Sequence, residues 1–121
     1  MAKTILIVDD SNAIRQSVSF ILEQAGYQVT QASDGVEAVK KLEAQPFDLI
    51  LTDVNMPNMD GIALTKHIRQ TADHKFTPVL MLTTESQANM MQEGKEAGAT
   101  GWIVKPFDPE KLLTTVKKLV G

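Results

Sequence analysis

Short apolar runs alternate along this sequence with longer stretches of helical periodicity. Three of the runs, residues 5–8, 49–51 and 79–82, consist entirely of aliphatic side chains and methionine. Runs of this kind are typical of strands that are buried on both faces, as in a parallel sheet. Parallel strands have to be joined by crossover segments, which are usually helices. The alternation therefore predicts an α/β fold built on a parallel sheet.

The segments between the runs carry signals that begin and end helices. Apolar residues at positions 14, 18, 21 and 22 repeat at helical spacing, and Gly26 follows them as a stop. Asp34 and Glu37 have capping-box spacing, and Asp108 is a candidate cap for a final helix. Residues 28–32 alternate polar with apolar or small side chains, which is typical of an edge strand. Together these signals predict a doubly wound, flavodoxin-like sheet of five parallel strands in the order 2-1-3-4-5.

Length and composition limit the class of protein. The chain has 121 residues, 43% of them hydrophobic, which corresponds to one domain over residues 1–121. A net charge of −3 argues against a basic nucleic-acid-binding face, and the lack of cysteine excludes disulfides and thiolate metal sites. The sequence has no signal peptide and no apolar stretch of membrane-spanning length. We expect a cytoplasmic protein that binds neither nucleic acid nor membrane.

Acidic, hydroxyl and amine side chains follow the predicted strands. In a sheet of this order, ligands bind outside the carboxyl ends of the strands, where the strand order reverses between strands one and three. We therefore expect five residues to gather at that edge: Asp9, Asp10, Asp53, Thr83 and Lys105.

Three carboxylates in one crevice repel each other and need a cation to coexist. Oxygen ligands with open positions suit Mg²⁺, which usually shares its coordination shell with a phosphate. Asp10 and Asp53 would bind the ion directly, Asp9 would act through water, and a backbone carbonyl within residues 54–56 would complete the set. The pattern predicts a magnesium site.

The same cluster is suited to phosphoryl transfer. Asp53 would attack the phosphoryl group and form an aspartyl phosphate. Lys105 would hold one phosphoryl oxygen as a point charge, and Thr83 would donate a hydrogen bond to another. Taken one at a time, these residues fit helix caps, turns or solvated surface better than they fit a functional site. Their joint position at one edge of the sheet favours the functional interpretation.

Other sites on the same fold can be compared with these residues. A flavin site needs a loop rich in serine, threonine and glycine after the first strand, where this chain has Asp9 and Asp10. The glycine-rich motif of P-loop nucleotidases is absent. Phosphatases with an aspartate nucleophile carry a second aspartate two residues later, whereas this chain has Asn55. An amide cannot transfer the proton, so we expect no enzyme that turns over an external substrate.

A predicted helix over residues 87–97 has weak apolar anchoring. Its apolar content includes Met90 and Met91, and Gly94 in its interior costs about 1 kcal/mol relative to alanine. A weakly anchored helix with flexible methionines suits a movable or partner-binding surface. An ordinary marginal surface helix fits these features equally well.

The motifs above resemble those of response regulator receiver domains over essentially the whole chain. The likeness rests on Val8-Asp9-Asp10-Ser11, on Asp53-Val54-Asn55-Met56-Pro57 with Met59-Asp60-Gly61, on Thr83, and on Lys105-Pro106-Phe107. The resemblance implies that Asp53 accepts a phosphoryl group from the phosphohistidine of a sensor histidine kinase. It also implies Mg²⁺ ligation by Asp9, Asp10, Asp53 and the Asn55 carbonyl, and a cis peptide bond before Pro106.

The resemblance further implies a conformational switch and a partner. Thr83 and Trp102 hold the switch positions of the family, although tyrosine or phenylalanine is more usual at the second. Asn55 and Glu85 hold the positions that tune loss of the phosphoryl group, as in the single-domain chemotaxis regulators of the CheY type. The output surface would comprise the helix over 87–97, the strand after it and the final helix, with these residues in contact with the partner: Met90, Met91, Lys95 and Trp102.

The sequence leaves two functions open for such a switch. As a monomer without an output domain, it would bind a flagellar motor switch protein, and a dedicated phosphatase is a further candidate partner. Alternatively, it would be a phosphorelay carrier or a phosphate sink that shares a kinase. Both use the same chemistry at Asp53, so the sequence does not separate them, and it does not identify the kinase.

Overall fold

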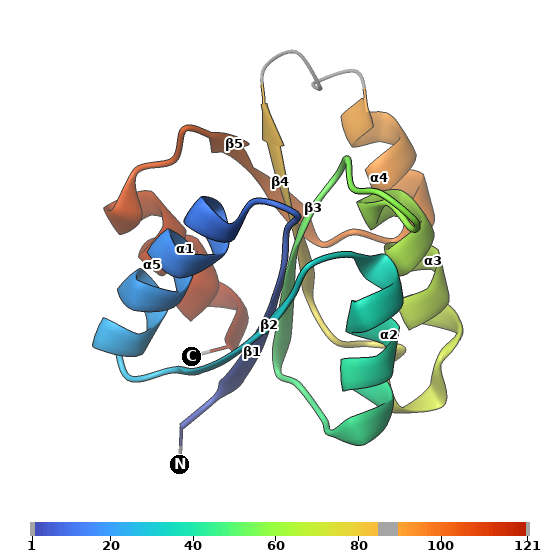
Figure 1. Cartoon of the computed structure of the whole chain (residues 1–121), viewed down its shortest axis with the longest axis horizontal. Helices are drawn as coiled ribbons and strands as arrows, with labels where there is room; N and C mark the ends of the chain where they lie inside the picture. The colour runs from blue at the N-terminus through green and yellow to red at the C-terminus, as the bar shows by residue number, and fades with distance from the viewer. Residues whose placement is uncertain (1, 85–89, 121) are drawn as a thin grey trace.

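A parallel sheet lies between two layers of helices in the computed structural model, which describes residues 2–84 and 90–120 (Figure 1). The strands have the order β2-β1-β3-β4-β5, so the predicted sheet order is confirmed. Their bounds are Thr4–Val8 for β1, Gln28–Ala32 for β2, Leu49–Asp53 for β3, Val79–Thr84 for β4 and Gly101–Lys105 for β5.

Helices cover both faces of the sheet (Figure 1). Helices α1 and α5 pack on one face, while α2, α3 and α4 lie on the other. The bounds are Asn12–Gln24 for α1, Gly35–Ala44 for α2, Gly61–Gln70 for α3, Met91–Ala97 for α4 and Pro109–Val120 for α5, with a short 3₁₀ helix, η1, at Ala72–His74. None of the described helices is long and apolar enough to cross a membrane.

The inner strands β1, β3 and β4 are buried almost throughout, as their aliphatic composition predicts. Their side chains alternate between the two faces of the sheet, where they join separate hydrophobic clusters. One core contains Ile5, Leu51 and Leu82 with residues of α1 and α5, and the other contains Leu6 and Ile50 with residues of α2 and α3. Because both faces are buried, the register of each inner strand is fixed, and so is the edge at which its last residue lies.

Polar side chains cap the N-termini of α1, α2 and α3, near the carboxyl ends of the strands. The backbone N–H of Glu37 donates to Asp34 Oδ1 at 2.8 Å, so the predicted cap of α2 is confirmed. The carboxylate of Glu37 accepts from the N–H of Ser33 at 3.0 Å, one residue earlier than a capping box requires. Ser11 caps α1 and Asp60 caps α3 in the same manner. These caps fix where each loop ends and therefore shape the loops that carry the acidic residues.

Helix α4 shows why its sequence signal is weak. The predicted helix over 87–97 is described from Met91 onward, and residues 85–89 lie outside the described part of the chain. Gly94 is buried, and a Cβ atom there would lie only 2.7 Å from the sulfur of Met81 in β4. The interior glycine therefore serves close packing of α4 on the sheet, which periodicity does not reveal.

Candidate functional site

Three carboxylates meet at the carboxyl ends of β1 and β3. Val8 and Thr52 are register partners, so Asp9 and Asp53, one residue further on, lie side by side. Asp10 joins them, and carboxylate oxygens of the three residues lie within 4.8 Å of one another. Asp9 is fully buried and Asp53 is nearly so, while Asp10 is exposed. The cluster therefore has a desolvated floor and one carboxylate open to solvent.

Lys105 reaches this cluster from the end of β5. Its Nζ lies 3.0 Å from Asp9 Oδ2 and 3.2 Å from Asp53 Oδ1. Strand β4 separates β5 from β3, so the long lysine side chain spans two strand positions. Burial lowers the pKa of the Lys105 amine, but the two carboxylates outweigh this effect and raise its pKa above the ordinary value. The site therefore favours the protonated, ammonium form of Lys105.

The environment of Asp53 opposes its ionisation. Burial, and then the neighbouring charge of Asp9, raise the pKa of Asp53 above its ordinary value. Contacts with Lys105, and the N–H of Val54 at 2.9 Å, act in the opposite direction without cancelling the rise. Carboxylates whose pKa is perturbed by burial and a neighbouring charge are concentrated at functional sites, so Asp53 is a candidate for chemistry.

Thr83 lies one residue before the end of β4, directly across from Val104 in β5. Its side chain is 1% exposed, and its hydroxyl oxygen has no hydrogen-bond partner among residues 2–84 and 90–120. A buried hydroxyl without a partner is costly, and a bound ligand, an ion or a water molecule can supply the partner. Thr83 is thus available to donate to a group bound at the cluster.

The donor set fits the predicted magnesium ion. Oxygen is the ligand atom that Mg²⁺ prefers, and it binds through a small number of carboxylates while keeping waters. Asp9 already accepts from the N–H of Ser11 through Oδ1 and from Lys105 through Oδ2. Asp10 is exposed beside it, and its carboxylate makes no such hydrogen bond among the described residues. Direct binding by Asp10 and binding through water by Asp9 stay predictions. Asn55 is exposed in the loop after β3.

The remaining predicted residues lie along β5 and α4. The Lys105–Pro106 peptide bond is cis, the isomer that the family resemblance implies. Trp102 is 38% exposed and faces outward on the edge strand. Met90 and Met91 are half-buried and Lys95 is exposed. Glu85 lies outside the described residues, so the structure does not place it.

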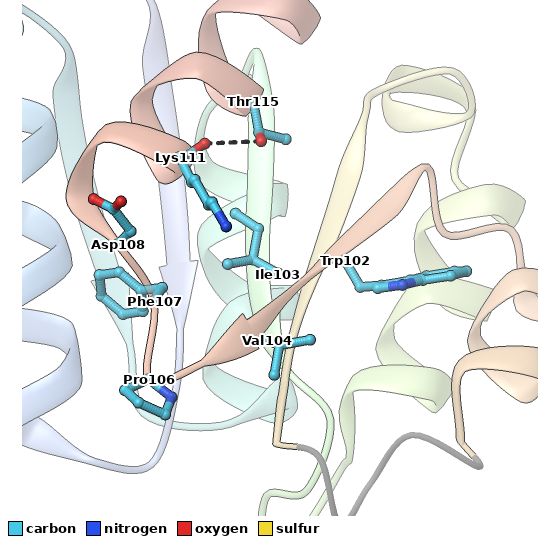
Figure 2. Close-up of a pocket in the computed structure, with 8 residues that line it drawn as sticks. All are labelled: Trp102, Ile103, Val104, Pro106, Phe107, Asp108, Lys111 and Thr115. Atoms are coloured by element: carbon cyan, nitrogen blue, oxygen red, sulfur yellow. Dashed lines mark hydrogen bonds between the residues drawn. The ribbon is translucent and has the colours of Figure 1, made fainter.

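A surface groove of about 370 Å³ lies between β5 and the start of α5. It is lined by Trp102, Val104, Phe107 and Lys111, among others. Figure 2 shows the indole of Trp102 directed away from Phe107 and Lys111, at one end of the groove. The groove begins at the same strand whose last residue, Lys105, contacts the carboxylates.

The structure also reveals residues that sequence reasoning missed. The guanidinium of Arg15 donates to the backbone carbonyl of Asp9 and, through Nε, to Gln31 at 3.2 Å. The amide of Asn58 donates to Asp34 Oδ2 at 2.7 Å. The contacts Arg15–Gln31 and Asn58–Asp34 join side chains that are 16 and 24 residues apart in the sequence. The sequence offers no signal that pairs such residues.

With the geometry described, comparisons with known proteins identify the family. A model of the response regulator receiver domain matches residues 5–117. The chain belongs to this family. The receiver domain is 42% identical over 116 residues to chemotaxis protein CheY-3 of Vibrio cholerae, covering 95% of this chain and 89% of that protein. It is also 41% identical over 120 residues to the transcriptional regulatory protein PhoP of Bacillus subtilis, covering 99% of this chain and 49% of PhoP.

Solved structures give the same result. Chemotaxis response regulator CheY4 of Vibrio cholerae is 51% identical, with a TM-score of 0.93 over 98% of this chain and 99% of that chain. The receiver domain of sensor histidine kinase PA1611 from Pseudomonas aeruginosa is 29% identical, with a TM-score of 0.92 over 100% of this chain and 99% of that chain. That structure has a magnesium ion coordinated in its active-site cleft. This chain is a two-component receiver domain whose relatives include chemotaxis proteins.

Proposed function

We propose that this receiver domain is a phosphorylation-operated switch, and that Asp53 accepts its phosphoryl group from the phosphohistidine of a sensor histidine kinase. One observation carries the proposal. Lys105 contacts Asp9 and Asp53 at 3.0 and 3.2 Å within a cluster of three acids, on the edge of the sheet that binds ligands in this fold.

The chemistry assigns Asp53 the role of nucleophile. One of its carboxylate oxygens forms a bond to phosphorus while the phosphorus–nitrogen bond of the phosphohistidine breaks. The imidazole leaves with the electron pair and takes up a proton. Bound Mg²⁺, held by Asp9, Asp10, Asp53 and the Asn55 carbonyl, would neutralise charge on the phosphoryl group.

Lys105 and Thr83 would read the phosphorylated state. Once Asp53 carries the phosphoryl group, Lys105 can bind a phosphoryl oxygen from its present position between the two acids. The unpartnered Thr83 hydroxyl would donate to another oxygen. Asn55 and Glu85 would tune the loss of the phosphoryl group to water, and the absence of an acid at position 55 supports a switch without turnover of an external substrate.

The output surface would lie on α4, β5 and α5. Trp102 and Val104 are two residues apart in β5, so they lie on the same side of the strand, and each is 38% exposed. Lys111 lines the same groove as these two residues (Figure 2). On α4 and its N-terminal flank, Met90, Met91 and Lys95 would add to the output surface. Exposed aromatic side chains and methionines are enriched at protein interfaces, and we propose that the partner is a flagellar motor switch protein.

The test measures binding to the purified motor switch protein of the same organism, with and without Mg²⁺ and the phosphoryl mimic beryllofluoride. We expect the mimic to raise the affinity of the wild type and to leave Asp53→Asn unchanged. Trp102→Ala should lose about tenfold in affinity, since a buried aromatic anchor contributes more than 1 kcal/mol. Phe20→Ala is the matched control, because Phe20 is an aromatic residue 66% exposed on α1.

One result would contradict the switch, and another would contradict the role of Trp102 in its output. Mimic-loaded protein that ignores the motor protein but passes its phosphoryl group to a phosphotransfer domain would establish the carrier or sink function. Loss of Asp53 phosphorylation in Trp102→Ala would show that Trp102 does not belong to a separate output surface.

A further inference from the structure

The loop between β3 and α3 carries Asn55, and one contact closes its base. The N–H of Gly61 donates to the carbonyl of Val54 at 2.8 Å. This hydrogen bond brings the two ends of the loop over residues 55–60 close together. Asn55 is exposed and Met56 is only partly buried. A loop of this shape needs a second attachment if the Asn55 carbonyl is to stay beside the carboxylates.

The start of α2 supplies that attachment through two adjacent hydrogen bonds. The side-chain amide of Asn58 donates to Asp34 Oδ2 at 2.7 Å. The N–H of Gly35 donates to the carbonyl of Met59 at 3.2 Å. The other carboxylate oxygen of Asp34 accepts from the N–H of Glu37 at 2.8 Å, so the helix itself holds the acceptor in place.

Local backbone geometry is specialised for this contact. Asn58 has a φ of 67°, a left-handed conformation that asparagine tolerates better than most residues. A Cβ atom on Gly35 would lie 2.6 Å from Met59, so only glycine allows the loop and the helix to approach so closely. The pKa of Asp34 is lowered, first by the Glu37 N–H and then by the Asn58 amide, in keeping with an ionised acceptor.

We propose that Asp34 and Asn58 are positioning residues that hold the β3–α3 loop in its metal-binding conformation. The inference rests on the proposed function, because it takes the Asn55 carbonyl as a magnesium ligand. Neither residue touches the carboxylate cluster in the contacts above; each acts through the loop. The start of α2 thereby becomes part of the magnesium site.

The test measures Mg²⁺ affinity by isothermal titration calorimetry for two variants of Asn58. Asn58→Gly removes the amide but keeps the left-handed backbone free of strain. Asn58→Asp has nearly the same shape and places a carboxylate against that of Asp34. We expect Asn58→Gly to weaken Mg²⁺ binding about threefold to tenfold, near the lower end of the effect of outer ligand contacts, and Asn58→Asp to weaken it more.

A control separates positioning from general loss of stability. Asp48→Ala removes another long-range carboxylate contact, 2.9 Å from the N–H of Thr4, at the opposite end of the sheet. Urea unfolding should show similar destabilisation for Asp48→Ala and Asn58→Gly, but only the latter should bind Mg²⁺ more weakly. At saturating Mg²⁺, Asn58→Gly should again be phosphorylated at Asp53 to the extent of the wild type.

The outcomes distinguish this inference from the proposed function. Wild-type Mg²⁺ affinity in both Asn58 variants, or equal weakening in Asp48→Ala, would overturn the positioning role while Asp53 phosphorylation still stands. A wild-type protein that neither binds Mg²⁺ nor becomes phosphorylated at Asp53 would overturn the proposed function, and the positioning role with it.

Discussion

At the scale of single residues, charge balance explains the composition of the site. Three carboxylates and the ammonium of Lys105 carry a formal charge of −2, which is the charge that a divalent cation neutralises. Burial makes any imbalance expensive, because charges interact more strongly away from water. The raised pKa of Asp53 reflects this burial and the charge of Asp9. Lys105 and the metal would therefore act on the same carboxylates.

Replacing Lys105 with methionine separates these two cations. Lys105→Met keeps most of the apolar stem and removes the ammonium, so Mg²⁺ should bind at least as tightly as in the wild type. Asp53→Asn, which removes a ligand charge, should bind Mg²⁺ about tenfold more weakly. Calorimetric titration of both variants checks this, with Lys111→Met as an exposed-lysine control.

The same Lys105→Met protein should lose the rise in partner affinity on adding beryllofluoride, because the phosphoryl oxygens lose their contact with β5. Weaker Mg²⁺ binding in Lys105→Met than in the wild type would mean that the ammonium supports the metal rather than competing with it.

At the scale of elements, α3 is seated directly on the strand that carries Asp53. A Cβ atom on Gly61, the first residue of α3, would lie 2.2 Å from the carbonyl oxygen of Asp53. The contact is with backbone, so no side-chain rotation relieves it. Glycine at this position therefore determines how closely the helix can approach Asp53.

Gly61→Ala should destabilise the protein by about 2 kcal/mol through overpacking and should slow phosphorylation of Asp53. Ala63→Gly is the control, since it weakens the exposed face of the same helix by up to about 1 kcal/mol without touching β3. Urea unfolding and phosphorylation rates check both variants. A Gly61→Ala protein with wild-type stability would show that α3 can move away from β3 at no cost.

The contact of His74 in η1 with Phe47 predicts how the free energy of unfolding depends on pH. His74 in η1 is 2% exposed, and its Nε2 accepts from the N–H of Phe47 at 3.3 Å. Burial lowers the pKa of His74, and the charge of Asp73 offsets this only in part. The unfolded chain therefore binds a proton more readily than the folded one does.

Because the folded-state pKa of His74 is the lower one, its contribution to stability is complete above about pH 6.5, the ordinary histidine value. It is lost as the pH falls from there toward the folded-state pKa, with a slope of at most about 1.4 kcal/mol per pH unit. Urea unfolding at a series of pH values should show this loss in the wild type and in His67→Gln, but not in His74→Gln. An identical slope in all three proteins would assign the effect to other groups.

At the scale of the whole molecule, the features that the sequence predicts are those set by strand burial. Aliphatic runs place β1, β3 and β4 in the interior, and the sheet order then brings Asp9, Asp10, Asp53 and Lys105 to one edge. Contacts between loops depend on the tertiary structure, and the sequence pattern does not predict them. Asn58 and Asp34 are 24 residues apart, and no sequence pattern pairs them. In the sequence, Gly94 is only a residue that weakens a helix, and its packing against Met81 of β4 is visible only in the folded structure.

Peptide-level mass spectrometry can determine whether Asp53 is the residue that accepts the phosphoryl group. The protein is incubated with Mg²⁺ and the phosphorylated kinase domain, then treated with borohydride, which reduces an aspartyl phosphate to homoserine. We expect homoserine at position 53 in the wild type and none in Asp53→Asn. Homoserine at Asp9 or Asp10 in the wild type, or equal phosphoryl incorporation into Asp53→Asn, would contradict this expectation.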